Sequence, residues 1–335
     1  MILTALKETV YLKKKIRIAF IHHKDSRFLS GSHFDNTYYN FFIKAWKRNQ
    51  SMDVTYFPTD DKIDVSEFKG RFDIIFLWSN DNFEMPQEII GIKELGIPVI
   101  ARCGDPVDAR NAIEFHEKWK IDYYISFYSE EFFHELYPKH FKYKTIFFGV
   151  EPKLFENMTP FQDRIKNRIL LTGAVGNKKL HTRIINDILR PKWNAYRFYN
   201  LRTKCSDLPF IDYTPTLQHN YVGDEYPKLL QKYAASITAT SYNPNIKYWE
   251  NAAAGCLTFM EITEKNKGKF LGYEDNKTCI MINNDNYQEK FLAFLSDPQN
   301  SKWEEIANAG KEYALKNFAN DVAAESLIEL MKSFG

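Results

Sequence analysis

The pattern that most constrains the fold of this chain is the alternation of short apolar runs with longer helical segments. The runs are rich in Ile, Val, Phe and Tyr and lack period-two alternation, which is typical of parallel strands buried on both faces. In the first half we expect strands over Ile16–Ile21, Val54–Phe57, Asp73–Trp78, Ile97–Ala101, Tyr123–Ser126 and Thr145–Phe148. Between them we expect helices near Phe34–Lys47, Pro86–Leu95, Ala109–Trp119 and Glu130–Leu136. This order predicts an α/β fold with a doubly wound parallel sheet.

After a polar stretch at 151–167 the same pattern begins again. The strands expected there are Arg168–Thr172, Ala195–Tyr199, Ser236–Thr240, Cys256–Met260 and Cys279–Ile282. The helices expected there are Lys178–Leu189, Glu225–Tyr233, Asn245–Ala254, Tyr287–Leu295, Trp303–Asn317 and Val322–Lys332. Because single cores stop growing near roughly 250–300 residues, a chain of this length favours two domains.

We therefore predict two Rossmann-like domains. The first covers residues 1–150 and the second covers residues 168–318, with the polar stretch at 151–167 as the linker between them. A last helix within 319–335 is expected to pack back toward the first domain.

Charge and cysteine usage narrow the class of protein. The formal net charge of +2 lacks the basic excess of nucleic-acid-binding proteins, so we expect no nucleic-acid partner. The run at 13–15 is expected to be a solvated lead-in to the first strand, with peripheral contact to an anionic membrane as the alternative. No stretch approaches the roughly 20 apolar residues of a membrane-spanning helix, and residues 1–12 lack the features of a secretory signal. The cysteines are not at metal-ligand spacing, so we expect reduced thiols in a cytoplasmic protein.

One candidate site begins at Asn243-Pro244-Asn245, directly after an expected strand. Asn243 is a good N-cap and proline is favoured at the first helical position, so we expect a helix to start here. Ligands of open α/β sheets bind beyond the carboxyl ends of the strands, and the free N–H groups of a helix N-terminus bind phosphate. Lys247 would oppose the helix dipole unless an anion were bound, and Glu250 lies on the same face. An ordinary surface lysine–glutamate pair is the alternative.

A second candidate site opens the C-terminal half. Gly173 and Gly176 follow an expected strand and permit a tight turn with close backbone approach. Lys179 and Arg183 are four residues apart and share a helix face, where like charges cost roughly 0.2–0.5 kcal/mol unless an anion lies between them. The run lacks the Gly-Lys-Ser/Thr ending of a Walker motif, and a solvated basic face is the alternative.

The N-terminal half offers polar loops after its expected strands. His22 and His23 follow the first strand and are candidates for a base or a phosphate contact, with packing at the sheet edge as the alternative. Asp105 is placed to act as a general base or to accept a hydrogen bond from an acceptor hydroxyl. Asp108 is expected to cap the next helix. The sequence shows no metal-ligand spacing, no Gly-x-Ser-x-Gly elbow and no Gly-x-Gly-x-x-Gly after the first strand, which argues against a metal site, a serine hydrolase and an NAD dehydrogenase.

Three segments resemble one family. Residues 226–261, with Lys247-Tyr248-Trp249-Glu250-Asn251-Ala252-Ala253-Ala254-Gly255, resemble the donor-binding region of group 1 glycosyltransferases, closest to the spore-maturation CgeB-like branch. Residues 148–155 are similar to the domain junction of that family, and residues 306–318 are similar to its C-terminal helices. The resemblance covers roughly the last 190 residues, and the first half matches only in architecture.

The resemblance implies the GT-B fold, in which two Rossmann-like domains face a central cleft and the second domain holds most of the donor. It implies that Glu250 hydrogen-bonds the ribose of a nucleotide sugar. It also implies that the helix after Asn243, the turn at Gly173, and Lys178, Lys179 or Arg183 hold the diphosphate. Such enzymes transfer the sugar to a hydroxyl of a glycan, a lipid-linked or a small-molecule acceptor. They need no metal and no cofactor, because basic groups and helix dipoles stabilise the leaving nucleoside diphosphate.

One departure from the family leaves the chemistry open. Many retaining members carry a second glutamate, separated by seven residues from the ribose-binding one, and this position is Tyr242 here. If the reaction inverts the sugar, Asp105 is the expected base, and His23 is a second catalytic candidate. If it retains the configuration, the phosphate of the donor takes the acceptor proton. A GT-B-shaped epimerase or hydrolase and a non-catalytic nucleotide-sugar binding module remain alternative functions.

Overall fold

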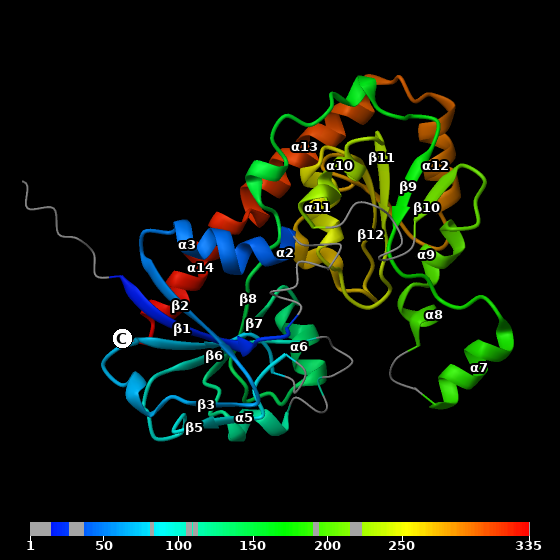
Figure 1. The fold of residues 1–335 in the computed structure, drawn as a ribbon. Coiled ribbons are helices and arrows are strands. Elements are labelled where there is room, and N and C mark those ends of the chain that lie inside the picture. The colour runs from blue at the N-terminus through cyan, green and yellow to red at the C-terminus, as the bar shows by residue number, and fades with distance from the viewer. Residues whose placement is uncertain are drawn as a thin grey trace, which may run out of the picture.

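The computed structural model describes residues 15–26, 37–80, 84–104, 109, 113–189, 194–214 and 223–334. The chain forms two α/β halves, each built on its own parallel sheet with helices packed around it (Figure 1). Among the described residues no helix is both long and apolar enough to cross a bilayer.

The first sheet has the strand order β2-β1-β4-β6-β7-β8, and all its pairs are parallel. Its strands are β1 (Ile16–His23), β2 (Met52–Thr59), β4 (Ile74–Leu77), β6 (Val99–Arg102), β7 (Tyr123–Ser126) and β8 (Tyr143–Thr145). A separate parallel pair is formed by β3 (Lys62–Asp64) and β5 (Glu88–Ile90). The helical elements of this half are α2 (Thr37–Asn40), the π-helical η1 (Phe41–Ala45), α3 (Trp46–Arg48), η2 (Ser66–Phe68), α5 (Glu114–Lys118) and α6 (Glu130–Leu136).

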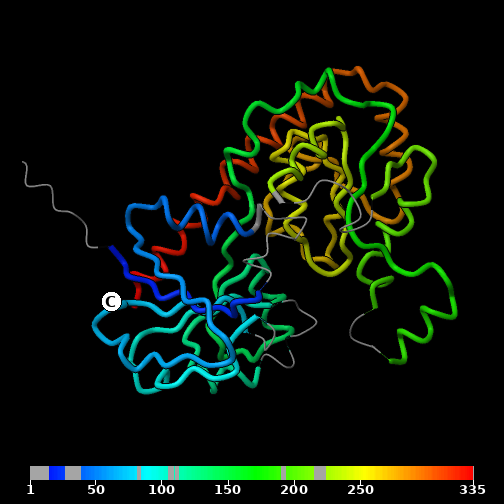
Figure 2. The backbone as a smooth tube through the Cα atoms, viewed as in Figure 1, coloured from blue at the N-terminus to red at the C-terminus, as the bar shows by residue number. Residues whose placement is uncertain are grey.

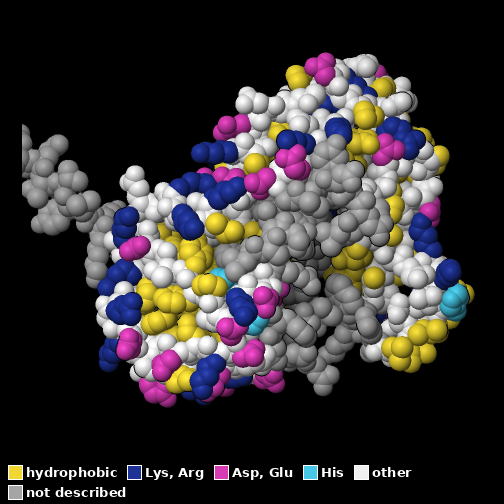
Figure 3. All heavy atoms as spheres, viewed as in Figure 1, with side chains coloured by type: hydrophobic (Ala, Val, Ile, Leu, Met, Phe, Trp, Pro, Cys, Tyr) yellow, Lys and Arg dark blue, Asp and Glu magenta, His cyan; other side chains and the backbone are white. Residues whose placement is uncertain are grey.

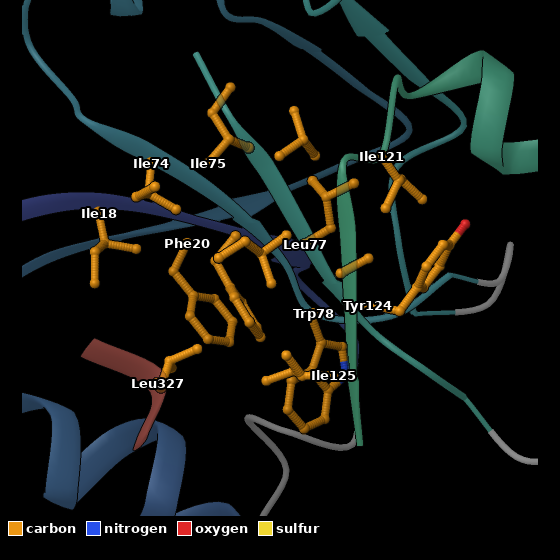
Figure 4. Close-up of a cluster of buried hydrophobic side chains, with 14 of the residues drawn as sticks. Ile18, Phe20, Ile74, Ile75, Leu77, Trp78, Ile121, Tyr124, Ile125 and Leu327 are labelled. Atoms are coloured by element: carbon orange, nitrogen blue, oxygen red, sulfur yellow. The ribbon is translucent and has the colours of Figure 1, made fainter. Parts of the chain in front are cut away.

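Aromatic side chains fill the core beneath the first sheet. Phe20 of β1 is fully buried, and its ring lies 5.0 Å from that of Phe76 and 5.4 Å from that of Trp46. Leu327, close to the C-terminus, enters the same cluster (Figure 4). Residues 18–21 of β1 and all four residues of β4 are apolar and buried, as expected for a sheet that is covered on both faces.

The second sheet has the order β10-β9-β11-β12-β13 and is also fully parallel. Its strands are β9 (Ile169–Thr172), β10 (Ile211–Thr214), β11 (Ala235–Thr238), β12 (Leu257–Glu261) and β13 (Ile280–Ile282). Its helical elements are α7 (Leu180–Leu189), α8 (Ala195–Phe198), α9 (Asn200–Cys205), η6 (Gly223–Glu225), α10 (Tyr226–Leu230), α11 (Lys247–Ala253), η7 (Gly268–Leu271), α12 (Tyr287–Ser296), α13 (Ser301–Phe318) and α14 (Asn320–Lys332).

The chain crosses between the two halves twice, and the two crossings lie side by side (Figure 2). The first leaves β8 through residues 146–168, with short turns η4 (Pro152–Leu154) and η5 (Phe161–Asp163), and the second joins α13 to α14. The buried side chain of Asn320 ties them together: its Oδ1 accepts from the N–H of Gly149 at 2.7 Å, and its Nδ2 donates to Glu151 at 3.1 Å. Helix α14 then packs on the core of the first half.

Three expected elements differ from the structure. The expected strand at 195–199 is helix α8, because the side chain of Asn194 accepts from the N–H of Tyr196 and caps a helix there. The edge strand that pairs with β9 is instead β10, further along the chain. The expected helix at 86–95 is instead strand β5 followed by a turn at Gly91, whose φ is +80°. The last strand of the first sheet covers 143–145, and residues 147–148 instead pack at the junction of the two halves.

Candidate functional site

The second sheet has a topological switch point between β9 and β11. From β9 the chain moves to the edge strand β10 on one side, and then returns to β11 on the other side. The connections that leave the carboxyl ends of β9 and β11 therefore diverge and open a crevice, which is where open α/β sheets bind ligands. Thr172 and Thr238 mark these two ends, so residues just beyond them are the candidates for a site.

Lys247, the first residue of α11, is buried at this crevice. Its side chain is only 4% exposed, and its Nζ donates to the hydroxyl of Tyr226 at 3.1 Å. The same hydroxyl lies 2.7 Å from Oγ1 of Thr172 at the end of β9. Burial holds the pKa of Lys247 well below its usual range, although the carboxylate of Glu250 opposes this shift. A buried ammonium of this kind is stabilised by any anion that enters beside it.

Arg202, which lies on α9, is a second buried cation. Its guanidinium is 2% exposed, stacks 4.6 Å from the ring of Tyr199, and donates from Nη1 to the carbonyl of Ala174 at 3.1 Å. Its Nε and Nη2 have no hydrogen-bond partner in the described part of the chain. Buried donors are nearly always paired, so these two N–H groups are suited to a ligand with several acceptor oxygens.

Lys247 and Arg202 meet at Gly173, directly after β9. A Cβ atom added to Gly173 would lie 3.0 Å from Nη1 of Arg202 and 3.3 Å from Cε of Lys247. The backbone of Gly173 has φ +108°, a conformation that side chains strongly disfavour. Glycine is therefore required here both by the backbone and by the two cations.

Glu250 supplies the carboxylate of the cluster. It lies three residues after Lys247 on the same helix and is fully buried. Its charge raises the pKa of Lys247 and adds to the burial that raises the pKa of Tyr226, so it is close to both. Glu250 offsets part of the positive charge of Lys247 and Arg202. The unpartnered N–H groups of Arg202 stay available to the oxygen atoms of a phosphate-bearing ligand.

A second carboxylate, Glu261, ends β12 next to this cluster. Its side chain is buried, and Oε2 has no hydrogen-bond partner among the described residues. Burial raises the pKa of Glu261 to about 7, and the charge of Arg202 opposes the shift. Arg202 and Glu261 were both missed from the sequence. Arg202 lies in a helix that the apolar pattern did not predict, and Glu261 follows an apolar run like any strand-terminal residue.

The expected N-cap at Asn243 is wrong. Helix α11 begins at Lys247, and the loop before it is held by Oγ1 of Thr240, which donates to the carbonyl of Asn243 at 2.7 Å. The side chain of Asn243 donates to the carbonyl of Pro244 at 2.6 Å. Asn245 takes the capping role, because its Oδ1 accepts from the N–H of Lys247 at 3.2 Å. The helix has seven residues, and the alternative of an exposed surface pair of Lys247 and Glu250 is also excluded by their burial.

The expected grouping of Lys178, Lys179 and Arg183 with Lys247 is not found. Lys178 forms an ion pair with Asp207, and Lys179 is exposed. Arg183 donates from Nε to the carbonyl of Asn177 at 3.0 Å and stacks 3.4 Å from a tyrosine ring of α8. Helix α7, which carries Arg183, lies well apart from α11 (Figure 1). The loop after β9 turns outward beyond Gly176, so these three cations leave the crevice.

The first sheet has its own switch point, between β1 and β4. His23 ends β1 there, with Nδ1 3.9 Å from Asp25 and Nε2 3.9 Å from Asp61. His22 is buried and packs at the sheet edge, where its Nδ1 lies 2.9 Å from the carbonyl oxygen of His23. Asp105 and Asp108 lie outside the described residues. Within the described part of the chain, no group of three His, Cys, Asp or Glu side chains could hold a metal ion.

Comparison with known proteins supports the architecture. No family model and no curated protein matches the sequence. Solved structures do match over almost the full length. HepE of Anabaena, in complex with UDP-glucose, superposes with a TM-score of 0.56 at 11% identity, covering 95% of this chain and 100% of its own. An alpha-glucosyltransferase in complex with UDP-glucose and DNA containing an abasic site gives 0.57 at 10% identity, covering 95% and 99%.

The chain has the GT-B fold. Sucrose-phosphate synthase from Thermosynechococcus elongatus matches as well, with a TM-score of 0.54 at 9% identity over 96% of this chain and 99% of its own. These matches cover both halves of the chain. The Lys247–Arg202 cluster lies at the carboxyl end of β9 in the second sheet.

Proposed function

We propose that the protein is a glycosyltransferase that moves a sugar from a nucleoside diphosphate sugar to a hydroxyl acceptor. The observation that carries this proposal is the convergence of Lys247 and Arg202 on Gly173 at the switch point of the second sheet. Two buried cations that meet at a glycine, where the backbone can be approached closely, fit a diphosphate. The GT-B structures with bound UDP-glucose give the nucleotide sugar as the matching ligand class.

The two cations would act on the leaving group. When the bond between the anomeric carbon and the phosphate oxygen breaks, negative charge grows on the nucleoside diphosphate. Arg202 would donate from Nε and Nη2, and Lys247 would supply an ammonium group held in place by Tyr226. Preorganised buried donors of this kind stabilise a developing anion far better than solvated ones. On this account the leaving diphosphate needs no metal ion and no cofactor.

The rest of the donor site follows from the same geometry. Glu250 is one turn of α11 from Lys247 and would accept hydrogen bonds from the ribose hydroxyls. Asn243, in the loop between β11 and α11, would contact the sugar or phosphate through backbone groups. Lys178, Lys179 and Arg183 point away from this cluster, so we give them no role in donor binding.

The acceptor and the catalytic base belong to the first domain. Asp105 comes after β6 in the sequence and His23 is the last residue of β1, and the carboxyl ends of these two parallel strands lie on one edge of the first sheet. For an inverting reaction we propose Asp105 as the base, with His23 as the second candidate. For a retaining reaction, the donor phosphate held by Arg202 would take the acceptor proton. We further propose hexosyl transfer in the cytoplasm, with a glycan, a lipid-linked molecule or a small molecule as acceptor.

The test is release of nucleoside diphosphate from a panel of nucleotide sugars, chosen first by thermal shift. Release that depends on an added hydroxyl acceptor, with the sugar recovered on that acceptor, is the expected result. Free sugar or an epimer formed without acceptor would instead show a hydrolase or epimerase. Binding of a nucleotide sugar without any turnover would show a binding module.

A further inference from the structure

Helix α7 is turned with its apolar side toward solvent. None of its ten described residues is buried, and five aliphatic side chains are at least half exposed. These side chains are Leu180, Ile184, Ile185, Ile188 and Leu189, with exposures of 68%, 51%, 50%, 72% and 73%. At 100° per residue they span one half of the helix, and His181 lies on the same side.

The polar side of α7 faces the protein. Arg183 stacks on the ring of Tyr196, and Asp187 accepts from the side chain of Asn194 at 2.6 Å and pairs with Arg197 at 3.0 Å. These contacts fix the orientation of the helix, since rotating the apolar side inward would break all three. The apolar surface is therefore held outward by specific bonds and is not simply left over from poor packing.

Basic residues outnumber acidic ones in α7 and the segments next to it. Figure 3 shows hydrophobic side chains gathered at the end of the second domain where α7 lies, with a histidine and Lys or Arg side chains beside them. In residues 177–189 and 194–197 there are four basic residues and one acidic residue, whereas the whole chain is nearly balanced with 45 Lys and Arg against 43 Asp and Glu. The charges in these segments are Lys178, Lys179, Arg183, Arg197 and Asp187.

We propose that α7 is a docking helix for the surface of an anionic lipid bilayer. A helix with an aliphatic face and an excess of basic residues binds at the interface of an anionic bilayer, where the aliphatic side chains enter the acyl region and the basic ones contact the headgroups. A nucleic acid would be attracted by the basic groups but would leave five aliphatic side chains in water. This proposal does not rest on the proposed transferase activity, because it uses no residue of the Lys247–Arg202 cluster.

The test is co-sedimentation of the full chain with vesicles of phosphatidylcholine alone or with about 30 mol% phosphatidylglycerol. We expect binding to the anionic vesicles, and we expect Ile188→Glu to weaken it at least about tenfold. Leu180→Glu makes the same change at the other end of the apolar face of α7, and we expect a similar loss of binding. Leu292→Glu is the matched control, since Leu292 is 55% exposed on α12, and we expect less than about a twofold change. Binding should also weaken with added salt, because the attraction to the headgroups is screened.

Four outcomes would overturn the proposal. These are no binding of the wild-type chain to anionic vesicles, an equal loss in Leu292→Glu, a dimer of the chain that Ile188→Glu dissociates, and binding to double-stranded DNA in place of vesicles. Circular dichroism checks that each variant is folded. Titration of each variant with nucleoside diphosphate, expected to be unchanged, separates this proposal from the proposed function.

Discussion

Nη1 of Arg202 lies 3.0 Å from the position that a Cβ atom of Gly173 would occupy. The guanidinium therefore reaches the backbone of the turn after β9 only because that residue has no side chain. Lys247 approaches the same point from α11, and this shared approach is the basis of the diphosphate site.

Gly173→Ala tests this approach. The new methyl group would displace Arg202 and strain a backbone with φ +108°, at a cost of order 1–3 kcal/mol in unfolding free energy. We expect affinity for nucleoside diphosphate, measured by calorimetric titration, to fall at least about tenfold. Gly70→Ala is the matched control: its φ is +76° and nothing lies within 4 Å of the added Cβ. The control should lose stability but keep its affinity. Unchanged affinity in Gly173→Ala would count against the site.

The lowered pKa of Lys247 leads us to predict that the protein takes up a proton when the diphosphate binds. Burial lowers the pKa of Lys247 in the free protein, and a bound anion would raise it again. Between the lowered pKa and the ordinary value of 10.5, binding should therefore take up a proton, so affinity should fall as pH rises through this window. Calorimetry in buffers of different ionisation enthalpy measures this uptake. Lys247→Met should abolish it and Lys179→Met should not, and uptake that persists in Lys247→Met would assign it to another group.

Glu261 predicts a pH dependence of stability. Its pKa is raised from 4.5 to about 7 in the folded chain, so the folded state binds the proton more tightly than the unfolded state. The contribution of Glu261 is thus most favourable below pH 4.5 and is lost as pH rises through 7. At pH 8 we expect Glu261→Gln to unfold with a free energy greater than wild type by on the order of 3 kcal/mol, and near pH 4.5 the difference should vanish. Urea unfolding at both pH values checks this, and a difference independent of pH would show that Glu261 does not titrate in this range.

The buried hydrogen bonds of Asn320 are expected to stabilise the junction between the two halves. Removing its side chain leaves the N–H of Gly149 and the carboxylate of Glu151 without their buried partner. We expect Asn320→Ala to lower the free energy of unfolding by about 1–3 kcal/mol. Gln288→Ala removes an exposed hydrogen bond to the hydroxyl of Tyr287 and should change the free energy of unfolding by less than about 0.5 kcal/mol. Equal effects of the two substitutions would mean that the junction is not stabilised by Asn320.

Much of the fold could be predicted from the sequence, because buried parallel strands carry a strong local signal. The expected strands around Phe20, Phe76 and Leu171 are confirmed, since each run is mainly apolar and none of them lies at an edge of its sheet. The expected strand at 195–199 is wrong. Its aromatic residues are typical of a strand, but the side chain of Asn194 caps a helix there. The resemblance to the CgeB-like branch stays a prediction.

The candidate site was predicted only in part. Lys247 and Gly173 were singled out because they follow strands and have a local reason to bind an anion, and Glu250 because it shares a helix face with Lys247. The structure brings the three together, and their roles in binding stay predictions. Arg202 could not be found, since it comes from a helix that precedes the edge strand β10 and joins the crevice only through tertiary folding. Arg183 was wrongly grouped with Lys247, because spacing along one helix does not reveal which way that helix points.

Calorimetric titration with nucleoside diphosphates tests the central claim most directly. UDP, GDP and ADP are compared first with the wild-type chain, and the tightest is then used with Arg202→Met and Arg183→Met. We predict that Arg202→Met weakens binding at least about tenfold, because its free N–H groups are lost from a buried site, while Arg183→Met changes it by less than about threefold. Full affinity in Arg202→Met, or a larger loss in Arg183→Met, would contradict the account.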